Sequence, residues 1–205
     1  MTTVDGKPLP AIGFLTAVES PQHGLFGGYL VLSLQGRPLE FRCTTPVKPT
    51  RAQEILYGKT LRPYLLCELL GHPLISQAQL RPELVVTNQN EMLGLSLLCD
   101  LPVGVVSPID GEAASDADRF IEKTGDLSLS RQPSLTSINT WGNCQVQFPE
   151  ETQLEPNIRE LLDRLSSYVE LNEPFSRIEA ALAEAQQAAE EEVDDNETHR
   201  NQAAA

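Results

Sequence analysis

Three strand-like runs, joined by short turns, open the chain and constrain its fold more than any other feature. Leucine, β-branched and aromatic residues dominate these runs, and glycine, proline and polar residues separate them. The runs are IGFLTAVE at 12–19, YLVLSL at 29–34 and LEFRCTT at 39–45. Consecutive strands with short connections pair antiparallel, so the sequence predicts a three-strand meander. In the third run Leu39, Phe41 and Cys43 alternate with polar residues, and we expect these three side chains to be buried.

Two helical segments follow the meander. Pro46 and Pro49 end the third strand, and the pair Thr50 and Gln53 forms a capping-box pattern that begins a helix. The next run, LRPYLLCELLG at 61–71, is apolar nearly all round. A helix of that kind is predicted to be buried against the rest of the domain.

A strand–helix–strand unit comes next. ELVVTN at 83–88 and LPVGVVSP at 101–108 are typical of strands, and EMLGLSLLCD at 91–100 favours a helix between them. Two strands joined by a crossover helix run parallel. Together with the meander, this unit predicts an α/β fold with a mixed sheet.

The chain is expected to form one domain with two appended segments. Residues 1–108 are predicted to be the α/β core, and the polar, serine-rich residues 109–138 a flexible insert. Residues 139–188 supply an edge strand near WGNCQVQF and two amphipathic helices that complete the same domain. Residues 189–205 are predicted to be a disordered acidic tail.

Charge is distributed unevenly along the chain, whose formal net charge is −14. Residues 1–109 contain eight acidic and eight basic side chains, so the whole excess lies in residues 110–205. Within the neutral half, residues 37–62 carry six basic side chains against two acidic ones. Because a strongly acidic chain repels a phosphate backbone, duplex nucleic acid is not the expected partner.

The sequence favours a cytoplasmic location. No run approaches the ~20 apolar residues that a membrane helix needs, and the N-terminus lacks the pattern of a signal peptide. The four cysteines are far apart with no C-x-x-C pair, which predicts reduced thiols rather than a zinc site.

The basic stretch suggests an anion site at the start of the first helix. Free backbone N–H groups there carry partial positive charge, Lys48 and Arg51 flank the helix start, and Thr44, Thr45 and Thr50 supply hydroxyl groups. Solvent-facing charges, or charges paired with the acidic half, are the alternative explanations. The leading hypothesis is a non-catalytic cytoplasmic binding or scaffold protein without a cofactor, with a small anionic or phosphorylated ligand and room for a protein partner.

The order of elements between residues 12 and 108 is similar to the ribonuclease-H-like fold. That resemblance implies two metal ions held by carboxylates on the first strand, the first helix and the fourth strand. In this chain the first strand offers Glu19, and the first helical region offers Glu54 or Glu68. The fourth strand offers Thr87 and Asn88, and neither is a carboxylate.

The resemblance also implies a second function. Glu91 lies just beyond the fourth strand and is the remaining candidate ligand there. The alternative hypothesis is therefore a divergent or degenerate metal-dependent nuclease or phosphoesterase that uses Glu19, Glu54 and Glu91 with Mg²⁺ or Mn²⁺.

Two further stretches carry a resemblance without an activity. The segments FGGYLVLSLQGRPLEFRCTTPVKPTRAQEILYG and NEPFSRIEAALAEA resemble a group of uncharacterised bacterial conserved hypothetical proteins. That resemblance implies no function.

Overall fold

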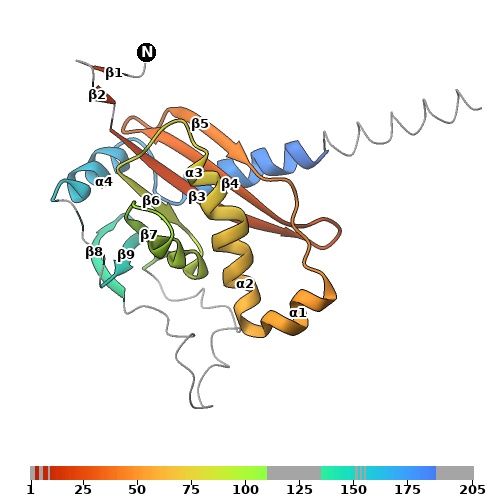
Figure 1. Ribbon diagram of the computed structural model, residues 1–205. Coiled ribbons are helices and arrows are strands. Elements are labelled where there is room, and N and C mark those ends of the chain that lie inside the picture. Colours follow the sequence, from red (N-terminus) through yellow and green to blue (C-terminus); the bar gives the residue numbers. More distant parts are fainter. Residues whose placement is uncertain are drawn as a thin grey trace, which may run out of the picture.

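A seven-stranded mixed sheet forms the centre of the described part of the computed structural model (Figure 1). The structure describes all residues except 1–2, 5–6, 9, 110–134, 151, 153, 155 and 188–205. The strand order in the sheet is β5-β4-β3-β6-β7-β9-β8, and β1 and β2 form a separate two-stranded ribbon. The strands are β1 Thr3–Val4, β2 Lys7–Pro8, β3 Ala11–Ser20, β4 Gly24–Ser33, β5 Pro38–Cys43, β6 Leu84–Thr87, β7 Val103–Pro108, β8 Leu135–Trp141 and β9 Cys144–Pro149.

The pairing of the strands confirms the predicted fold class. β3, β4 and β5 form an antiparallel meander, while β6 lies parallel to both β3 and β7. β9 and β8 continue the sheet as an antiparallel hairpin. β8 begins at Leu135, inside the range that the sequence predicts to be an insert. The sequence does not predict this strand because the polar residues of LTSINTW interrupt the apolar pattern that is typical of strands. The rest of that insert and the acidic tail lie outside the described residues.

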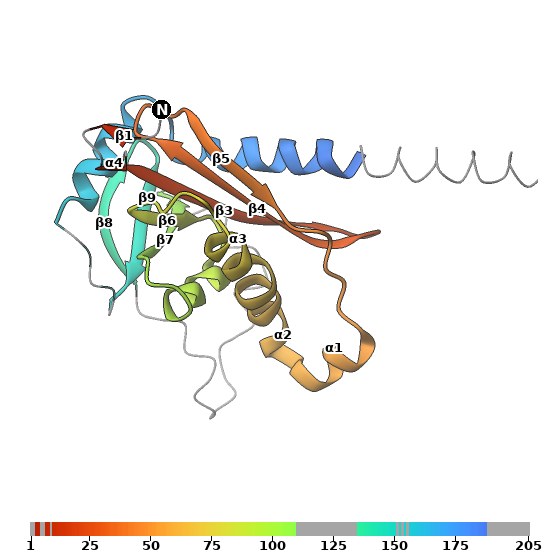
Figure 2. The ribbon, with the colours of Figure 1, turned by 45° about the horizontal axis from the view of Figure 1, so that its top comes forward.

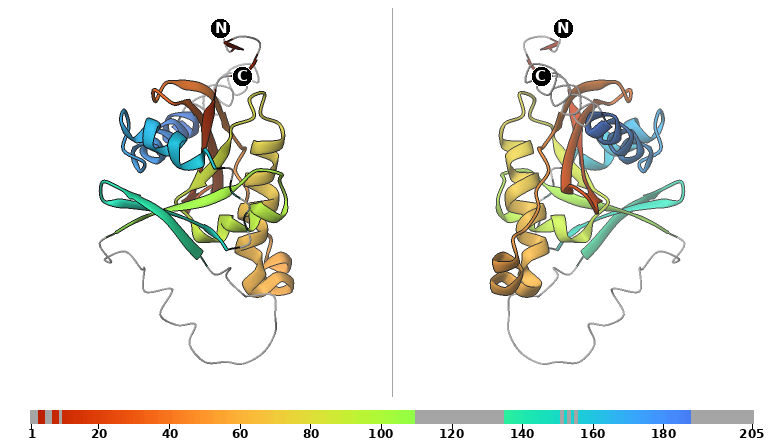
Figure 3. Two further views of the ribbon diagram at one scale, coloured as in Figure 1. Left: turned by 90° about the vertical axis from the view of Figure 1, so that its left-hand side faces the viewer. Right: turned by 90° about the vertical axis from the view of Figure 1, so that its right-hand side faces the viewer.

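Helices cover both faces of the sheet, as the two side views show (Figure 3). The helices are α1 Arg51–Tyr57, η1 Gly58–Thr60, α2 Leu61–Pro63, η2 Tyr64–Gly71, α3 His72–Ser76, η3 Asn90–Leu97, α4 Ile158–Ser166 and helical residues 173–187. The run from α2 to α3 is continuous, with π-helical geometry in η2, and η3 is a 3₁₀ helix rather than the α-helix that the sequence suggests.

Alternate residues of β3 belong to two separate cores. Ile12 and Phe14 pack with Phe175 and other residues of the C-terminal helices, whereas Leu15 packs with Leu66 of η2. Burial on both faces explains why β3 and β4 are almost continuously apolar. The predicted buried helix at 61–71 is confirmed by the burial of its inner face.

A glycine of β4 allows the last helix to pack closely. A Cβ at Gly28 would lie 2.2 Å from Ile178 Cγ2, so any larger residue there would displace the helix. Because Gly28 has no side chain, helical residues 173–187 can lie directly against the sheet at this point.

The predicted inner face of β5 is right only for Leu39, which is partly buried against the second core, and is wrong for Phe41 and Cys43. Phe41 is 41% exposed and Cys43 is also exposed, while the Glu40 carboxylate accepts hydrogen bonds from the backbone N–H groups of Gln79 and Leu80. The β4–β5 register shifts between Val31 and Leu32. A shift of one residue moves every later side chain of a strand to the other face, which accounts for the reversal.

α1 has no buried residue and projects from the body of the domain (Figure 2). The Thr50–Gln53 capping box predicted at its start is present. No helix among the described residues is both long and apolar enough to cross a membrane.

Candidate functional site at the ends of the parallel strands

Thr16 and Asn88 meet just beyond the carboxyl end of the parallel pairing between β3 and β6, a point that lies in the middle of β3 and directly after β6. We call this point the strand ends. Leu15 is paired with Thr87, so the residues that follow them lie side by side. The Thr16 hydroxyl, which is 1% exposed, donates a hydrogen bond to Asn88 Oδ1 at 2.7 Å. Asn88 itself is exposed. The carboxyl ends of parallel strands are the usual place for ligand sites in open α/β sheets.

The Gln89 side chain extends this pairing by one residue. Its Nε2 donates to the Ala17 carbonyl at 2.9 Å, and its Oε1 accepts from the Ala17 N–H at 3.2 Å. The Gln89 N–H in turn donates to the Thr87 hydroxyl at 3.2 Å. The strand ends are therefore held by neutral hydroxyl and amide groups that satisfy one another.

Arg62 of α2 is a positively charged residue that forms ion pairs with the two elements carrying Glu19 and Glu91. Its Nη1 lies 3.0 Å from Glu19 Oε2, at the end of β3, and its Nε lies 3.1 Å from Glu91 Oε1, in η3. Partial burial lowers the pKa of Arg62, but hydrogen bonds and the charges of Glu19 and Glu91 outweigh this and raise the pKa above its usual value. Arg62 therefore stays charged and links α2 to both neighbouring elements.

Of the three carboxylates considered for a metal site, the structure brings two together. Glu19 and Glu91 share Arg62 as their partner. Glu54 lies on the projecting helix α1, where it pairs with Arg51 at 2.8 Å. The arrangement joins Glu19 and Glu91 around a guanidinium group.

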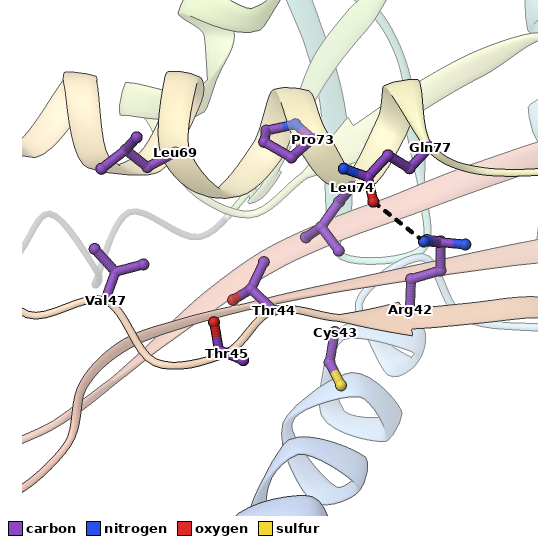
Figure 4. Close-up of a pocket in the computed structure, with 9 residues that line it drawn as sticks. All are labelled: Arg42, Cys43, Thr44, Thr45, Val47, Leu69, Pro73, Leu74 and Gln77. Carbon is purple, nitrogen blue, oxygen red and sulfur yellow. Dashed lines mark hydrogen bonds between the residues drawn. The ribbon is translucent and has the colours of Figure 1, made fainter.

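The five residues considered for an anion site do not share one cavity. Thr44 and Thr45 line a pocket of about 310 Å³ between β5 and the η2–α3 helix (Figure 4). The Thr44 hydroxyl is engaged there, since it accepts a hydrogen bond from the Gly27 N–H at 2.9 Å. The nine residues that line this pocket are Arg42, Cys43, Thr44, Thr45, Val47, Leu69, Pro73, Leu74 and Gln77.

The other members of that set lie outside the pocket. The Thr50 hydroxyl caps α1 by accepting from the Gln53 N–H, and Arg51 pairs with Glu54. Lys48 is exposed in the preceding loop. α1 has seven residues, and its N-terminus is occupied by its own cap.

A second pocket, of about 320 Å³, lies between the β3–β4 turn and the helical segment η1–α2. Lys59 and Arg62 bring positive charge to it, and Leu25, Leu61 and Leu65 bring apolar surface. The remaining lining residues are Glu19, Gly24, Pro49 and Gly58. Two of its lining residues, Glu19 and Arg62, form an ion pair, and Arg62 also pairs with Glu91 outside the pocket.

The residues present do not fit the pair of magnesium ions that the ribonuclease-H-like order implies. Magnesium prefers charged carboxylate oxygens, and the adjacent strand ends offer the Thr16 hydroxyl and the Asn88 amide instead. Glu19 and Glu91 share Arg62 as an ion-pair partner, which offsets one of their two negative charges and occupies an oxygen of each carboxylate. Within the described ranges, no three histidine, cysteine, aspartate or glutamate side chains are grouped so as to hold a metal ion.

Comparison with solved structures identifies the fold. Human endonuclease V superimposes with a TM-score of 0.50 at 14% identity, over 88% of this chain and 86% of that one. The chain shares its fold with endonuclease V. The catalytic domain of the human enzyme gives a TM-score of 0.48 at 14% identity, with 90% and 85% of the two chains covered. Endonuclease V of Ciona intestinalis, in complex with a 24mer DNA containing an inosine, gives 0.45 at 13% identity, with 85% and 87% covered. No family model and no curated protein sequence matches the chain.

The comparison corrects two predictions made from the sequence. The hypothesis of a non-catalytic binding or scaffold protein with an anion site at the first helix is contradicted, because the chain shares its fold with human endonuclease V, and the alternative of a divergent or degenerate nuclease explains that fold better. The exclusion of duplex nucleic acid is contradicted as well, because the chain shares its fold with human endonuclease V. Net charge misleads because it averages over the chain, whereas residues 1–109, which include Thr16, Arg62 and Asn88, contain equal numbers of acidic and basic side chains.

Sequence reasoning missed Thr16, Gln89 and Arg62. A signal for Thr16 exists, because it is the one polar residue within the apolar stretch 11–18. Its partner Asn88 could be named from the fourth strand, but the contact between them depends on long-range register. No local pattern distinguishes Arg62 from the other basic residues around it.

Proposed function

We propose that this chain is a degenerate metal-dependent nuclease of the ribonuclease-H-like fold. In this proposal it engages a nucleic acid at the strand ends and does not hold a metal pair there. One observation carries the proposal: a buried threonine and an asparagine, bonded at 2.7 Å, stand on the two strand ends where a nuclease of this fold needs carboxylates.

The chemistry of the strand ends supports recognition of a phosphate or sugar oxygen. The Asn88 oxygen is occupied by the Thr16 hydroxyl, so the Asn88 NH₂ group, which has no partner among the described residues, is the donor left for a ligand. Arg62 adds a fixed cation on the same side. Amide and guanidinium donors are the groups that proteins use for backbone contacts with nucleic acids.

The metal implied by the fold would supply Lewis-acid stabilisation of a phosphoryl oxygen and an activated water. Thr16 and Asn88 are neutral, and the carboxylates of Glu19 and Glu91 are already paired with Arg62. These residues support binding and orientation of a strand. They do not support hydrolysis through two metal ions.

The proposal is tested by measuring binding and cleavage in parallel. Fluorescence anisotropy with labelled single-stranded and duplex oligonucleotides should give salt-dependent binding, weakened by Asn88→Ala and by Arg62→Ala. Arg164→Ala is the matched control, because Arg164 is an exposed arginine on α4, across the sheet from α2. The same oligonucleotides should remain intact with Mg²⁺ or Mn²⁺.

Two outcomes overturn this proposal in different ways. Absence of binding at low salt would remove nucleic acid as the target. Metal-dependent cleavage that Glu19→Gln, Glu54→Gln or Glu91→Gln abolishes would instead establish an active, divergent nuclease.

A further inference from the structure

Residues 51–64 comprise α1, η1, α2 and Tyr64. They project from the body of the domain on the side of the sheet that α3 covers (Figure 2). We call this segment the arm. Ile55 is 67% exposed and Leu56 is 81% exposed, although both are large apolar side chains. Exposed apolar groups gathered on one short segment are typical of a contact surface.

Two tyrosine rings give the arm a defined aromatic surface. The rings of Tyr57 and Tyr64 lie with centroids 4.6 Å apart and planes tilted by 31°. Tyr57 is 38% exposed, and a hydrogen bond with the Tyr57 side chain raises the pKa of Tyr64. Tyr64 therefore supports one side of the Tyr57 ring and limits its rotation, which lowers the entropy lost when a flat ligand stacks on it.

Positive charge follows these rings closely in the sequence. Lys59 follows Tyr57 by two residues and lines the 320 Å³ pocket together with Arg62. Arg62 also pairs with Glu19 of β3 and with Glu91 of η3. The arm therefore carries an aromatic pair and two cations, and Arg62 links it to β3, the strand that also carries Thr16.

We propose that the arm is a stacking platform for unpaired bases of a nucleic acid strand. A base stacks on Tyr57, and Lys59 and Arg62 contact the adjoining phosphates. The inference rests on the proposed function, because it assumes that the strand ends engage a nucleic acid. An unpaired base exposes its π face to a protein aromatic ring, whereas a paired base is covered by its neighbours, so the platform acts on single-stranded tracts or on opened positions in a duplex.

The combination of groups favours a nucleic acid over a second protein chain. Surfaces for single strands combine aromatic side chains with cations that follow the phosphates, and Tyr57, Lys59 and Arg62 supply both within six residues. A purely apolar partner would leave Lys59 without a counterion. Phosphate groups provide that counterion directly.

The test compares binding of single-stranded and fully paired oligonucleotides of the same sequence by fluorescence anisotropy. Tyr57→Ala should weaken single-strand binding about 5- to 150-fold, the range that corresponds to the loss of one base–aromatic stack. Tyr57→Phe should keep the affinity, because the ring remains. Binding to the paired oligonucleotide should change much less with either variant, since it depends on the cations.

Matched controls separate stacking from general surface effects. Tyr168 is 66% exposed and lies outside the arm, so Tyr168→Ala should leave both affinities unchanged. Leu56→Ala removes apolar surface from the arm without an aromatic ring and should have a small effect. Circular dichroism of each variant establishes that it is folded.

The outcomes distinguish the platform from the function on which it rests. If the wild-type chain binds neither oligonucleotide, the proposed function fails. If it binds both and Tyr57→Ala binds as tightly as wild type, the platform alone fails. A dimer in sedimentation experiments that Leu56→Asp dissociates, with no effect of Tyr57→Ala on strand binding, would assign the arm to self-association and overturn the inference.

Discussion

Carboxylates at positions 16 and 88 should create a metal site that the described residues do not form in the natural sequence. In the double variant Thr16→Asp with Asn88→Asp, two carboxylates replace side-chain oxygens that are 2.7 Å apart. Two negative charges about 4 Å apart repel by about 4 kcal/mol at an effective dielectric constant near 20. Burial of position 16 adds a desolvation penalty. Without metal, the double variant should therefore be several kcal/mol less stable than wild type.

A divalent cation should recover much of that loss. Metal present at about 100 times its dissociation constant adds about 2.7 kcal/mol to the stability of a folded protein that binds it. For a chain of about 200 residues, each kcal/mol corresponds to about 2–4 °C in Tm. Differential scanning fluorimetry with Mn²⁺ should thus raise the Tm of the double variant by about 5–10 °C.

Controls make this experiment decisive. Thr16→Asn has nearly the size of the aspartate without its charge and should show no shift with Mn²⁺, and neither should wild type. Asn88→Asp alone changes an exposed residue, so it should remain folded and give a smaller shift. If Mn²⁺ shifts neither Asn88→Asp nor the double variant, the Thr16–Asn88 pair does not occupy a metal position, and the argument for a degenerate nuclease is refuted.

Two further predictions concern the scaffold that holds these residues. Gly28→Ala should lower the free energy of unfolding by about 1–3 kcal/mol or more in thermal denaturation, because the new Cβ would lie 2.2 Å from Ile178. Gly142→Ala is the control: no atom lies within 4 Å of its new Cβ, and its φ of +63° should make the substitution cost only about 1 kcal/mol. Burial raises the pKa of Cys67 to about 11, with Glu68 as the next cause, so a thiol reagent at pH 8 should label exposed Cys43 quickly and Cys67 only after unfolding. The neutral thiol contributes its stability below the unfolded pKa of about 8.5, and that contribution should be lost as pH rises from there toward 11. Rapid labelling of Cys67 in the folded chain would contradict this burial.

Much of the fold follows from local sequence, because its elements depend on local patterns. The strand runs, the capping box at Thr50 and the apolar helix at 61–71 each have a signal within a few residues. The face of β5 does not, because an irregular pairing with β4 between Val31 and Leu32 determines which side chains point inward. Phe41 and Cys43 are exposed for that reason.

The site was less predictable than the fold because it is built by contacts between distant residues. Asn88 could be placed from sequence as the fourth-strand residue. Its partner on β3 could not, since Thr16 is 72 residues away and the choice between Thr16 and Glu19 depends on the parallel register. Glu19 and Glu91 are linked in the structure, but the guanidinium that links them comes from a third element, which no local pattern indicates.

The distribution of charge gives a physical reason why a neutral strand edge and a basic arm belong together. A phosphate that approaches two carboxylates without a metal is repelled, whereas Thr16 and Asn88 present no charge. Glu19 and Glu91 would repel it too, but Arg62, which remains about half exposed, offsets one of their two negative charges, and Lys59 of the same pocket offsets the other. Positive charge that metal ions provide in a two-metal site would here come from Arg62 and Lys59. The same arginine thus removes repulsion at the strand ends and carries the attraction of the arm, which makes it the residue on which the proposed binding most depends.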